Sequence, residues 1–242
     1  MDKVNNKDLK VFIRGLEELN ISLNDVQVSQ FLAYYDLLIE RNKVMNLTSI
    51  TEFSEVLIKH FIDSLSICKV HQPACDKILD VGTGAGFPGI PIKIAFADTE
   101  VVLMDSLNKR VHFLEEVIDK LNLKSITVVH GRAEDYGRDK NFREAFDICT
   151  SRAVARLSTL AEYCLPFVKV GGSFIAYKSE NIEDELNEAG RAINTLGGKL
   201  VRAEVFSLPD TDIGRSLVLI EKKQNTPAKY PRLAGKPSKE PL

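Results

Sequence analysis

The stretch ILDVGTGAGFPGIP, residues 78–91, carries the strongest structural signal in this chain. An apolar segment that ends in Asp80 runs into a glycine-rich turn, and a segment compatible with a helix follows. The glycines of this loop are Gly82, Gly84, Gly86 and Gly89. The last three fit the dinucleotide pattern G-x-G-x-x-G, whereas Asp80 with the first three fits the acidic G-x-G-x-G loop of S-adenosylmethionine sites. Both patterns bring backbone amides at a helix N-terminus close to a ligand, so the loop alone does not distinguish the two cofactors.

From residue 77 onward, short apolar segments alternate with amphipathic ones. The expected strands are 77–81, 100–104, 125–129, 146–150 and 173–177. Each is a nearly continuous apolar run, which is the pattern of a strand buried on both faces. Amphipathic helices separate these runs, so the sequence predicts an α/β fold whose parallel sheet is covered by helices on both sides.

The end of the chain breaks this alternation. Two strand-like segments, 199–208 and 215–223, are separated only by a short polar turn. A parallel crossover needs roughly a dozen residues, so these two strands must be antiparallel neighbours. A parallel sheet closed by an antiparallel hairpin is typical of Rossmann-like S-adenosylmethionine methyltransferases, while a dehydrogenase more often continues with a second βαβ half. The hairpin therefore favours S-adenosylmethionine over NAD.

The segments that flank the sheet region differ from it in composition. Residues 1–72 are predicted to form a helical extension, in which Asn24 and Gln27 have the spacing of a capping box. Residues 73–223 form the expected methyltransferase domain, and residues 224–242 a basic tail that contains proline. From Glu221 to the end, the chain carries six basic and two acidic residues. We expect this tail to be extended and unfolded, and suited to contacts with phosphate groups.

Composition excludes several classes of protein. The chain has 242 residues, of which 44% are hydrophobic and 27% charged, and its formal net charge is −2. No apolar run reaches the roughly 18 residues of a membrane span, and the N-terminus is polar, so we expect a cytoplasmic protein. The four cysteines show neither C-x-x-C pairing nor a histidine at metal-binding spacing, so no metal site is expected. A monomer is expected because no helix shows an exposed apolar stripe.

Two acidic residues follow expected strands at the sheet edge where ligands bind in open α/β folds. Asp105 comes directly after 100–104 and can accept hydrogen bonds from ribose hydroxyls, in NAD and S-adenosylmethionine alike. Glu134, after 125–129, lies where adenine would lie and can accept from its exocyclic amine, while a neighbouring backbone amide meets a ring nitrogen. A phosphate-binding loop for ATP is excluded because no G-K-[ST] follows the glycines.

Several further motifs occur together in one order. They are RNKVMNLTSI (41–50), HFIDSL (60–65), GRAEDY (131–136), TSRAVARL (150–157) and KYPRLAGKPSKEPL (229–242). With the glycine loop, they resemble the bacterial ribosomal RNA small-subunit methyltransferase G family, also known as glucose-inhibited division protein B. The resemblance implies methylation of N7 of one guanosine in the 530 loop of 16S ribosomal RNA, with S-adenosylmethionine as the methyl donor. It also implies cofactor contacts at Gly82, Phe87, Ala133, Glu134 and Arg152.

Methylation of guanine N7 accounts for catalytic groups that the sequence lacks. N7 carries a free lone pair on the major-groove edge of the base. No proton has to be removed, so positioning and a suitable electrostatic site can supply catalysis without a general base. The segment 150–153 reads TSRA and not the [DN]-P-P-[YF] of many amino-group methyltransferases. Cys149 lies inside an expected strand without an adjacent proline, unlike many nucleophiles of pyrimidine C5 methyltransferases.

Two basic residues at the carboxyl ends of expected strands are the candidate catalytic residues. Arg152 could stack on the base, pair with a phosphate or contact the methionine carboxylate of the cofactor. Lys178 has the equivalent place after 173–177 and is expected to contact a phosphate of the substrate.

Four polar residues of the extension carry weaker signals. His60 and Asp63 share a helix face at positions i and i+3, which predicts a local structural pair or, alternatively, a role at the lip of the pocket. Asn46 and Thr48 are expected in a turn or a helix cap. The resemblance implies that Asn46 and Thr48 help to order the substrate base.

Two other functions stay open on the residues alone. A methyltransferase that acts on a small molecule or a protein would keep its turnover when the tail after Glu221 is deleted. A non-enzymatic ribosome-binding protein that senses S-adenosylmethionine would bind the cofactor without methyl transfer to any ribosomal substrate. The expected partner, 16S ribosomal RNA or the small ribosomal subunit, follows from the resemblance more than from composition.

Overall fold

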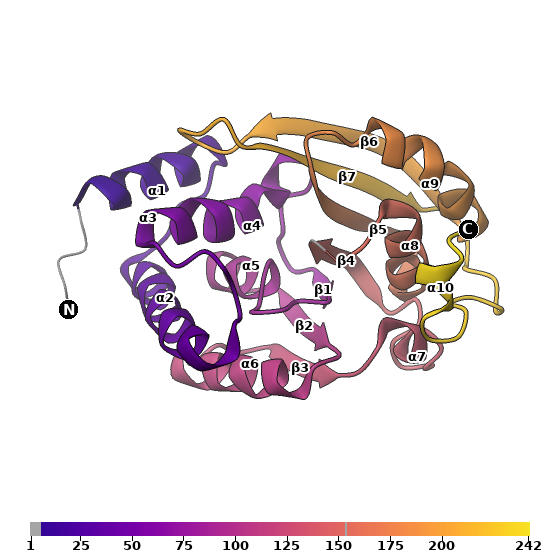
Figure 1. Cartoon of the computed structure of the whole chain (residues 1–242), viewed down its shortest axis with the longest axis horizontal. Coiled ribbons are helices and arrows are strands. Elements are labelled where there is room, and N and C mark those ends of the chain that lie inside the picture. Colours follow the sequence, from indigo (N-terminus) through magenta and orange to yellow (C-terminus); the bar gives the residue numbers. More distant parts are fainter. Residues whose placement is uncertain (1–5, 153) are drawn as a thin grey trace.

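A seven-stranded sheet forms the centre of the molecule (Figure 1). The computed structural model describes residues 6–152 and 154–242. In spatial order the strands are β3 (Ile126–His130), β2 (Glu100–Asp105), β1 (Lys77–Val81), β4 (Phe146–Arg152), β5 (Val168–Ser179), β7 (Gly214–Lys222) and β6 (Gly198–Ser207). Neighbours from β3 to β5 are parallel, and β7 is antiparallel to both β5 and β6. The Rossmann-like α/β class and its closing hairpin are confirmed.

The strand order reverses between β1 and β4. From β1 the chain continues outward to β2 and β3, and then returns to place β4 on the other side of β1. Asp80, near the carboxyl end of β1, is in register with Leu103 of β2 and Thr150 of β4. Ligands of open α/β sheets bind outside the carboxyl ends of the strands at such a reversal. The fold therefore places the site next to Asp80.

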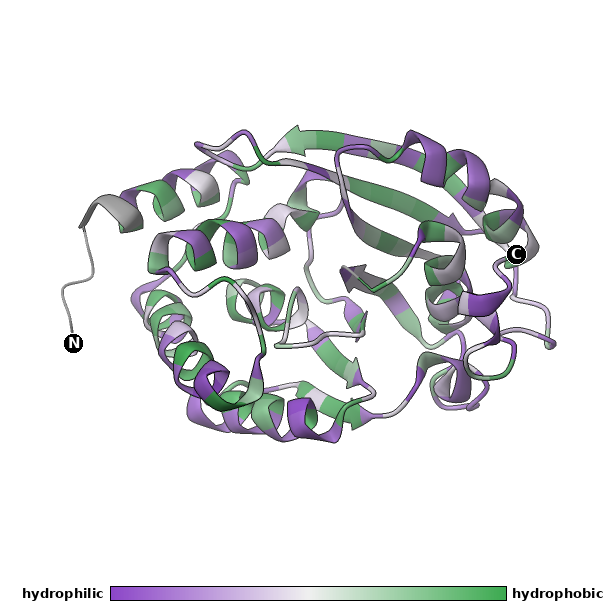
Figure 2. Ribbon diagram, in the orientation of Figure 1, coloured by the Kyte–Doolittle hydropathy of each residue, from purple (hydrophilic) through white to green (hydrophobic). Residues whose placement is uncertain are grey.

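Helices cover both faces of the sheet (Figures 1 and 2). One face carries α1 (Asn6–Glu18), α2 (Asp25–Met45), α5 (Gly89–Ala95) and α6 (Asn108–Lys120). The other face carries α7 (Ala133–Tyr136), α8 (Leu157–Cys164), the 3₁₀ turn η3 (Leu165–Phe167) and α9 (Glu183–Thr195). Each layer buries its own hydrophobic cluster against the apolar strands, which explains why the strands are apolar on both sides.

A composite helix leads from the extension to β1. It consists of α3 (Phe53–Val56), the π-helical η1 (Leu57–Ile62), α4 (Asp63–Leu65) and the 3₁₀ turn η2 (Ser66–Lys69). The apolar residues Val56, Leu57, Phe61 and Leu65 are buried, as expected for an amphipathic segment. π-Helical turns are rare and frequently occur at functional sites. Here the π-helical turn carries His60 and is followed directly by Asp63.

Helix α2 connects the extension to the glycine loop. The Asn24 side chain accepts from the Gln27 amide (3.0 Å), and the Gln27 side chain accepts from the Asn24 amide (2.9 Å), which confirms the capping box. The Gln27 side chain also donates to the carbonyl of Ile94 in α5 (2.8 Å). Further along α2, the buried hydroxyl of Tyr34 donates to the carbonyl of Ala85 in the glycine loop (2.5 Å). The helical extension therefore supports the glycine loop through a direct hydrogen bond.

The C-terminal tail is folded against the sheet domain, contrary to the expectation of an unfolded end. Glu162 of α8 is buried and accepts from both the backbone amide (2.7 Å) and the Nε (2.9 Å) of Arg232. Arg143 donates to the carbonyl of Tyr230 (2.8 Å). A short helix, α10 (Lys236–Lys239), then packs beside α8. Proline prevents a long helix but not packing, and the buried carboxylate of Glu162 holds the tail in place.

Within residues 6–152 and 154–242, no helix is long and apolar enough to cross a membrane. Over the same ranges, no three His, Cys, Asp or Glu side chains converge as metal ligands. Cys149 and Cys164 are buried in the core, Cys68 is half-buried, and Cys75 is exposed.

Candidate active site at the carboxyl edge of the sheet

The glycine loop connects β1 to α5 where the strand order reverses. Gly82, Gly84 and Gly86 have φ angles of 72°, 63° and 103°, a region that residues with a Cβ atom rarely adopt. Gly89 serves close packing instead, because a Cβ atom there would overlap Leu103 and lie 3.0 Å from Asp80 Oδ2. The loop sequence is therefore explained by backbone conformation and by the approach of α5 to the sheet.

Asp80 lies under this loop and is completely buried. Its Oδ2 accepts from the Thr83 hydroxyl (2.6 Å) and from the Gly89 amide (2.9 Å). Among the described residues, its Oδ1 has no hydrogen-bond partner, and neither has the buried Thr150 hydroxyl. Burial raises the pKa of Asp80 to about 6, although the bonds from Thr83 and Gly89 oppose the shift. An unpartnered buried carboxylate oxygen beside a glycine loop fits a cofactor that carries an ammonium group.

A cavity of about 240 Å³ opens beside the loop, at the carboxyl ends of β1 to β3. We call it the nucleoside cavity; its lining residues are Val81, Gly82, Met104, Asp105, Ser106, Gly131, Arg132, Ala133, Glu134, Val154 and Tyr163. The structure thus brings together Gly82, Asp105, Ala133 and Glu134, which the sequence indicated from separate motifs. It also adds Tyr163, on the helix that follows β4, for which no sequence pattern gave a signal.

Asp105 links β2 to the glycine loop. Its Oδ2 accepts from the Gly84 amide (3.0 Å) and lies 3.3 Å from the Arg110 guanidinium, and its Oδ1 accepts from the Leu107 amide (2.9 Å). Its side chain is almost completely buried. A carboxylate oxygen has two acceptor positions, so Oδ1 can still accept from a ribose hydroxyl. The predicted ribose contact is therefore compatible with these bonds.

Glu134 is held by the C-terminal tail. It is buried, and its Oε1 accepts from the backbone amide of Gly235 (2.9 Å). Gly235 has a φ angle of 80°, and the tail that carries it is anchored by the bonds between Arg232 and Glu162. The tail therefore forms part of the support of the nucleoside cavity. This role was not predicted, because the motif that contains Gly235, KYPRLAGKPSKEPL (229–242), does not indicate which residue the glycine contacts.

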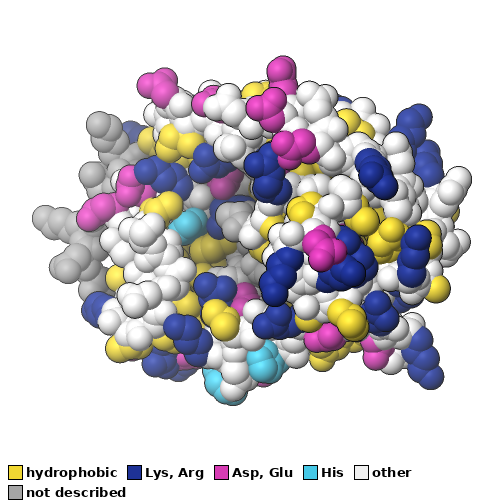
Figure 3. Space-filling model, turned by 45° about the vertical axis from the view of Figure 1, so that its right-hand side comes forward, with side chains coloured by type: hydrophobic (Ala, Val, Ile, Leu, Met, Phe, Trp, Pro, Cys, Tyr) yellow, Lys and Arg dark blue, Asp and Glu magenta, His cyan; other side chains and the backbone are white. Residues whose placement is uncertain are grey.

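A larger cavity of about 450 Å³ lies on the other side of the end of β4. Its lining residues are Ile50, Lys59, His60, Asp63, Arg152, Tyr177, Lys178, Ser179, Glu185 and Arg215. We call it the basic cavity, because four of these ten residues are Lys or Arg. Figure 3 shows Lys and Arg side chains around the hollowed part of this face, with a histidine visible beside it. Arg152, the last residue of β4, lines the basic cavity, and Val154 lines the nucleoside cavity, so both cavities lie at the carboxyl end of this strand. Ala153 of the predicted motif lies outside the described residues.

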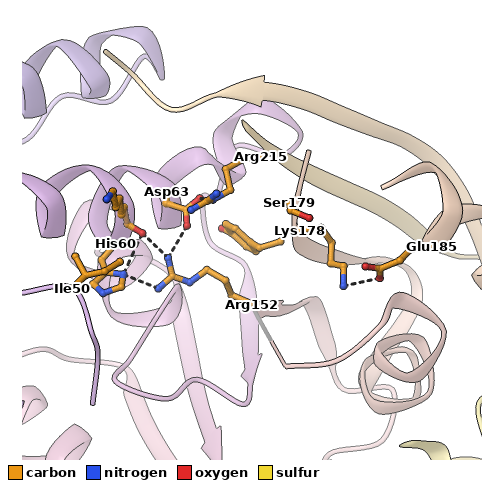
Figure 4. A pocket seen from close by; sticks show the side chains of 10 residues that line it. Ile50, His60, Asp63, Arg152, Lys178, Ser179, Glu185 and Arg215 are labelled. Atoms are coloured by element: carbon orange, nitrogen blue, oxygen red, sulfur yellow. Dashed lines mark hydrogen bonds and ion pairs between the residues drawn. The ribbon is translucent and has the colours of Figure 1, made fainter. Parts of the chain in front are cut away.

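Arg152 is held at the carboxyl end of β4 by groups on three elements (Figure 4). Its Nη1 lies 2.8 Å from Asp63 Oδ2 and donates to the carbonyl of Lys59 (3.2 Å). Its guanidinium carbon lies 4.9 Å from the centre of the Phe87 ring, within the range of a cation–π interaction. The structure thus joins two residues predicted to contact the cofactor, Phe87 and Arg152, in one stacked pair.

The side chains of His60 and Asp63 do not bond to each other, contrary to the expectation of a local pair, but both contact Arg152, whose Nη2 lies 3.4 Å from His60 Nδ1. Asp63 is buried and is bound by Arg152 and by Arg215, whose Nε lies 3.2 Å from Asp63 Oδ1. His60 stacks on Phe87, with ring centres 4.5 Å apart. Burial, reinforced by the charge of Arg152, lowers the pKa of His60 to about 3, so the imidazole is neutral near pH 7.

The turn after α2 supports His60. Asn46 ends α2 in the left-handed conformation with a φ angle of 50°, as the turn prediction requires. The Thr48 hydroxyl lies 2.8 Å from His60 Nε2 and accepts from the Ile50 amide (3.0 Å). Thr48 therefore contacts His60, which in turn lines the basic cavity.

Lys178 lies across the basic cavity from Arg152 (Figure 4). Its Nζ lies 2.7 Å from Glu185 Oε2 and donates to the carbonyl of Ala155 (2.9 Å). Its side chain is mostly buried and lines the cavity. The structure thus brings the two predicted catalytic residues to opposite sides of one cavity. It also places His60 and Asp63 in the lining, as the alternative expectation for them had it, and adds Glu185 and Arg215, which were not predicted there.

Comparison with known proteins identifies the family. The family model described as rRNA small subunit methyltransferase G matches residues 27–213. The chain belongs to this family. A relative named ribosomal RNA small subunit methyltransferase G from Lachnoclostridium phytofermentans is 58% identical and covers 98% of both chains. A relative of the same name from Lactococcus lactis is 48% identical over 96% of this chain and 98% of its own.

Solved structures support the same fold. A SAM dependent methyltransferase from Aquifex aeolicus aligns with a TM-score of 0.54 and 17% identity, over 72% of this chain and 96% of that one. TrmN from Thermus thermophilus aligns with a TM-score of 0.51 and 17% identity, over 66% and 48%. At these identities the likeness concerns the fold alone. Membership of the methyltransferase G family makes the chain an S-adenosylmethionine-dependent methyltransferase, as the glycine loop and hairpin predicted.

Ionisation of Asp80 is expected to make stability and cofactor affinity depend on pH in opposite directions. Its pKa is 3.8 in an ordinary environment and about 6 in the folded enzyme, so folding favours the protonated form. The Asp80 contribution to the free energy of unfolding is therefore largest below pH 3.8, falls as the pH rises to about 6, and is constant above. An ammonium group needs the ionised carboxylate, so cofactor affinity should weaken about tenfold per pH unit below this pKa.

Equilibrium dialysis with labelled S-adenosylmethionine tests this prediction. The dissociation constant should rise as the pH is lowered from about 7.5 to about 5, and in Asp80→Asn, which cannot ionise, this rise should be absent. A wild-type dissociation constant that stays constant over the range would show that Asp80 does not pair with the cofactor.

Proposed function

We propose that this chain transfers a methyl group from S-adenosylmethionine to N7 of a guanosine in the 530 loop of 16S ribosomal RNA, acting as a monomer in the cytoplasm. The observation that supports the proposal is that the nucleoside cavity and the basic cavity both lie at the carboxyl end of β4, where Arg152 lines the basic cavity and Val154 the nucleoside cavity. A cofactor in one cavity and an anionic substrate in the other would meet there. The names of the relatives specify ribosomal RNA as the substrate of those proteins.

The residues around the nucleoside cavity suit the cofactor part by part. Asp105 would accept from the ribose, Glu134 from the adenine amine, and the Ala133 backbone would meet a ring nitrogen. The unpartnered Oδ1 of Asp80 would take the ammonium group. The remaining proposed contacts are Gly82, Gly84, Gly86 and Phe87 of the glycine loop. When bound, S-adenosylmethionine supplies a methyl group attached to a positively charged sulfur.

The basic cavity suits a guanine base and its phosphates. Arg152 and Lys178, our proposed catalytic residues, present cationic donors from opposite walls. Asp63 and Phe87 hold the guanidinium plane of Arg152, so it is preorganised for contact with the base or with the methionine carboxylate. His60 is neutral near pH 7 and N7 needs no general base, so this cavity has to position the base but not to move a proton.

Product analysis tests the proposed reaction. Purified enzyme is incubated with labelled S-adenosylmethionine and small ribosomal subunits that lack the modification, and the digested RNA is analysed by mass spectrometry. We expect 7-methylguanosine at a single position in the 530 loop. Cofactor binding without incorporation into RNA would instead support a sensor or an enzyme with another substrate.

Deletion of the tail does not separate these functions, because the tail supports the nucleoside cavity. Gly235 bonds to Glu134 and Arg232 to Glu162, so a chain that ends after Glu221 loses support for the nucleoside cavity whatever the methyl acceptor is. The identity of the methylated product is therefore the informative measurement.

A further inference from the structure

Glu185 in the first turn of α9 has one engaged and one free carboxylate oxygen. Oε2 accepts from the backbone amide of Leu157 (2.8 Å) and lies 2.7 Å from Lys178 Nζ. Oε1 forms no hydrogen bond with any residue that the structure describes. Glu185 lines the basic cavity, and its side chain is 21% exposed. The protein therefore fixes the side chain through one oxygen and leaves the other as an acceptor.

Glu185 is the available carboxylate of this cavity. The other carboxylate in the lining, Asp63, is buried and its charge is paired with two guanidinium groups, Arg152 at Oδ2 and Arg215 at Oδ1. The four basic side chains of the lining can only donate hydrogen bonds. A ligand that itself donates from a planar edge would therefore find its anionic acceptor at Glu185.

Glu185 and Arg152 line the basic cavity from different elements, α9 and the end of β4. Figure 4 shows Arg152 beside His60 and Asp63 on one side of the cavity and Glu185 with Lys178 on the other. N7 and O6 of guanine are acceptors, whereas N1–H and the 2-amino group of its Watson–Crick edge are donors. A base whose N7 points toward Arg152 and the glycine loop turns its donor edge toward the opposite wall.

We propose that Glu185 Oε1 accepts from the Watson–Crick edge of the target guanine and thereby selects guanine over adenine. This role rests on the proposed function. Adenine also has a nucleophilic N7, but its N1 is an acceptor and would face a carboxylate oxygen without a proton between them. Arg152 and Lys178 do not supply this selection, because phosphates and either purine can accept from them.

Glu185→Gln tests the proposal by changing one atom. The bonds from Leu157 and Lys178 require an acceptor at the Oε2 position, so the amide oxygen stays there and the amide nitrogen replaces Oε1. A donor then faces the donors of guanine. We expect kcat/KM on small subunits to fall roughly 10- to 100-fold, while the dissociation constant of S-adenosylmethionine is unchanged.

Glu183→Gln is the matched control. Glu183 lies in the same turn of α9, is exposed, and does not line the basic cavity. The substitution removes the same charge with the same change of shape, so a general electrostatic effect on RNA binding would appear in both variants. The control should retain wild-type kcat/KM.

A second measurement separates base selection from a structural role through Lys178. Small subunits reconstituted with transcribed 16S ribosomal RNA carry either guanosine or adenosine at the target position, and initial rates are compared by mass spectrometry of the methylated nucleosides. In Glu185→Gln the ratio of the guanosine rate to the adenosine rate should shrink at least tenfold, because the new donor opposes guanine and suits adenine N1.

The outcomes are distinguishable. Unchanged kcat/KM in Glu185→Gln, or equal losses on both bases, would overturn the selection role while leaving the proposed reaction intact. Absence of 7-methylguanosine with the wild-type enzyme would overturn the proposed function and, with it, the role of Glu185.

Discussion

Replacement of Arg152 by alanine is expected to lower kcat/KM for methyl transfer by roughly 100- to 1,000-fold, the range found when one preorganised donor is removed from an active site. Arg152 lines the basic cavity at the carboxyl end of β4, and Asp63, Phe87 and the Lys59 carbonyl hold it in one orientation. Its loss removes the donor and leaves Asp63, which is buried, with Arg215 as its remaining cationic partner. Both effects act on the cavity where the substrate would bind.

Arg152→Lys separates charge from geometry. Lysine keeps the positive charge but cannot provide the planar group that stacks on Phe87 and donates to two acceptors at once. We expect this variant to recover stability more fully than kcat/KM. Initial rates, cofactor dissociation constants and unfolding temperatures should be measured for both variants. An alanine variant with a lowered unfolding temperature but wild-type kcat/KM would show that Arg152 is only structural.

Gly89→Ala is the second substitution with a large expected effect. The new methyl group would overlap Leu103 and approach Asp80 Oδ2, and both of these side chains are completely buried and cannot move aside. Overpacking of a close-packed core costs about 1–3 kcal/mol of unfolding free energy. Because Gly89 also donates to Asp80, we expect the displaced carboxylate to weaken cofactor binding as well.

Gly190→Ala provides the control for this substitution. Gly190 lies within α9, and apart from its chain neighbours and the backbone of the helix itself, no atom lies within 4 Å of the position of an added Cβ atom. Alanine in a helix interior is more favourable than glycine by about 0.5–1 kcal/mol, so this variant should be more stable than the wild type. Urea unfolding with and without S-adenosylhomocysteine measures both effects. Wild-type stability and affinity in Gly89→Ala would contradict the packing argument.

Local sequence patterns were sufficient for the sheet. Strands buried on both faces read as apolar runs, and the short turn before β7 permits only an antiparallel neighbour. The structure lengthens β5 beyond the predicted 173–177 to Val168–Ser179. The added residues include a pairing between Val168 and Phe146 of β4, with an irregular register before Ile148. Pairing with β4 therefore extends β5 beyond the residues whose apolar pattern predicted a strand.

The same patterns indicated the residues that we propose to contact the cofactor. Asp105 and Arg152 end strands, Asp80 lies one residue before the end of β1, and Glu134 closely follows a strand; the carboxyl ends of parallel strands meet at one edge of the sheet. The family could also be recognised from the sequence, because its motifs are short and occur in a recognisable order. Neither prediction depended on the hydrogen-bond or ion-pair partners of these side chains.

The pairing of charges was decided by the tertiary structure. Arg152 and Asp63 are 89 residues apart, and Arg215 and Asp63 are 152 apart, so no local periodicity relates them. The same holds for Gly235 and Glu134, which are 101 residues apart and which turn a tail expected to be unfolded into support for the cofactor site. Periodicity and strand order specify which face and which edge a residue occupies. Which opposite charges meet across that edge depends on packing between distant segments, and this determines which carboxylate oxygen is left free for a ligand.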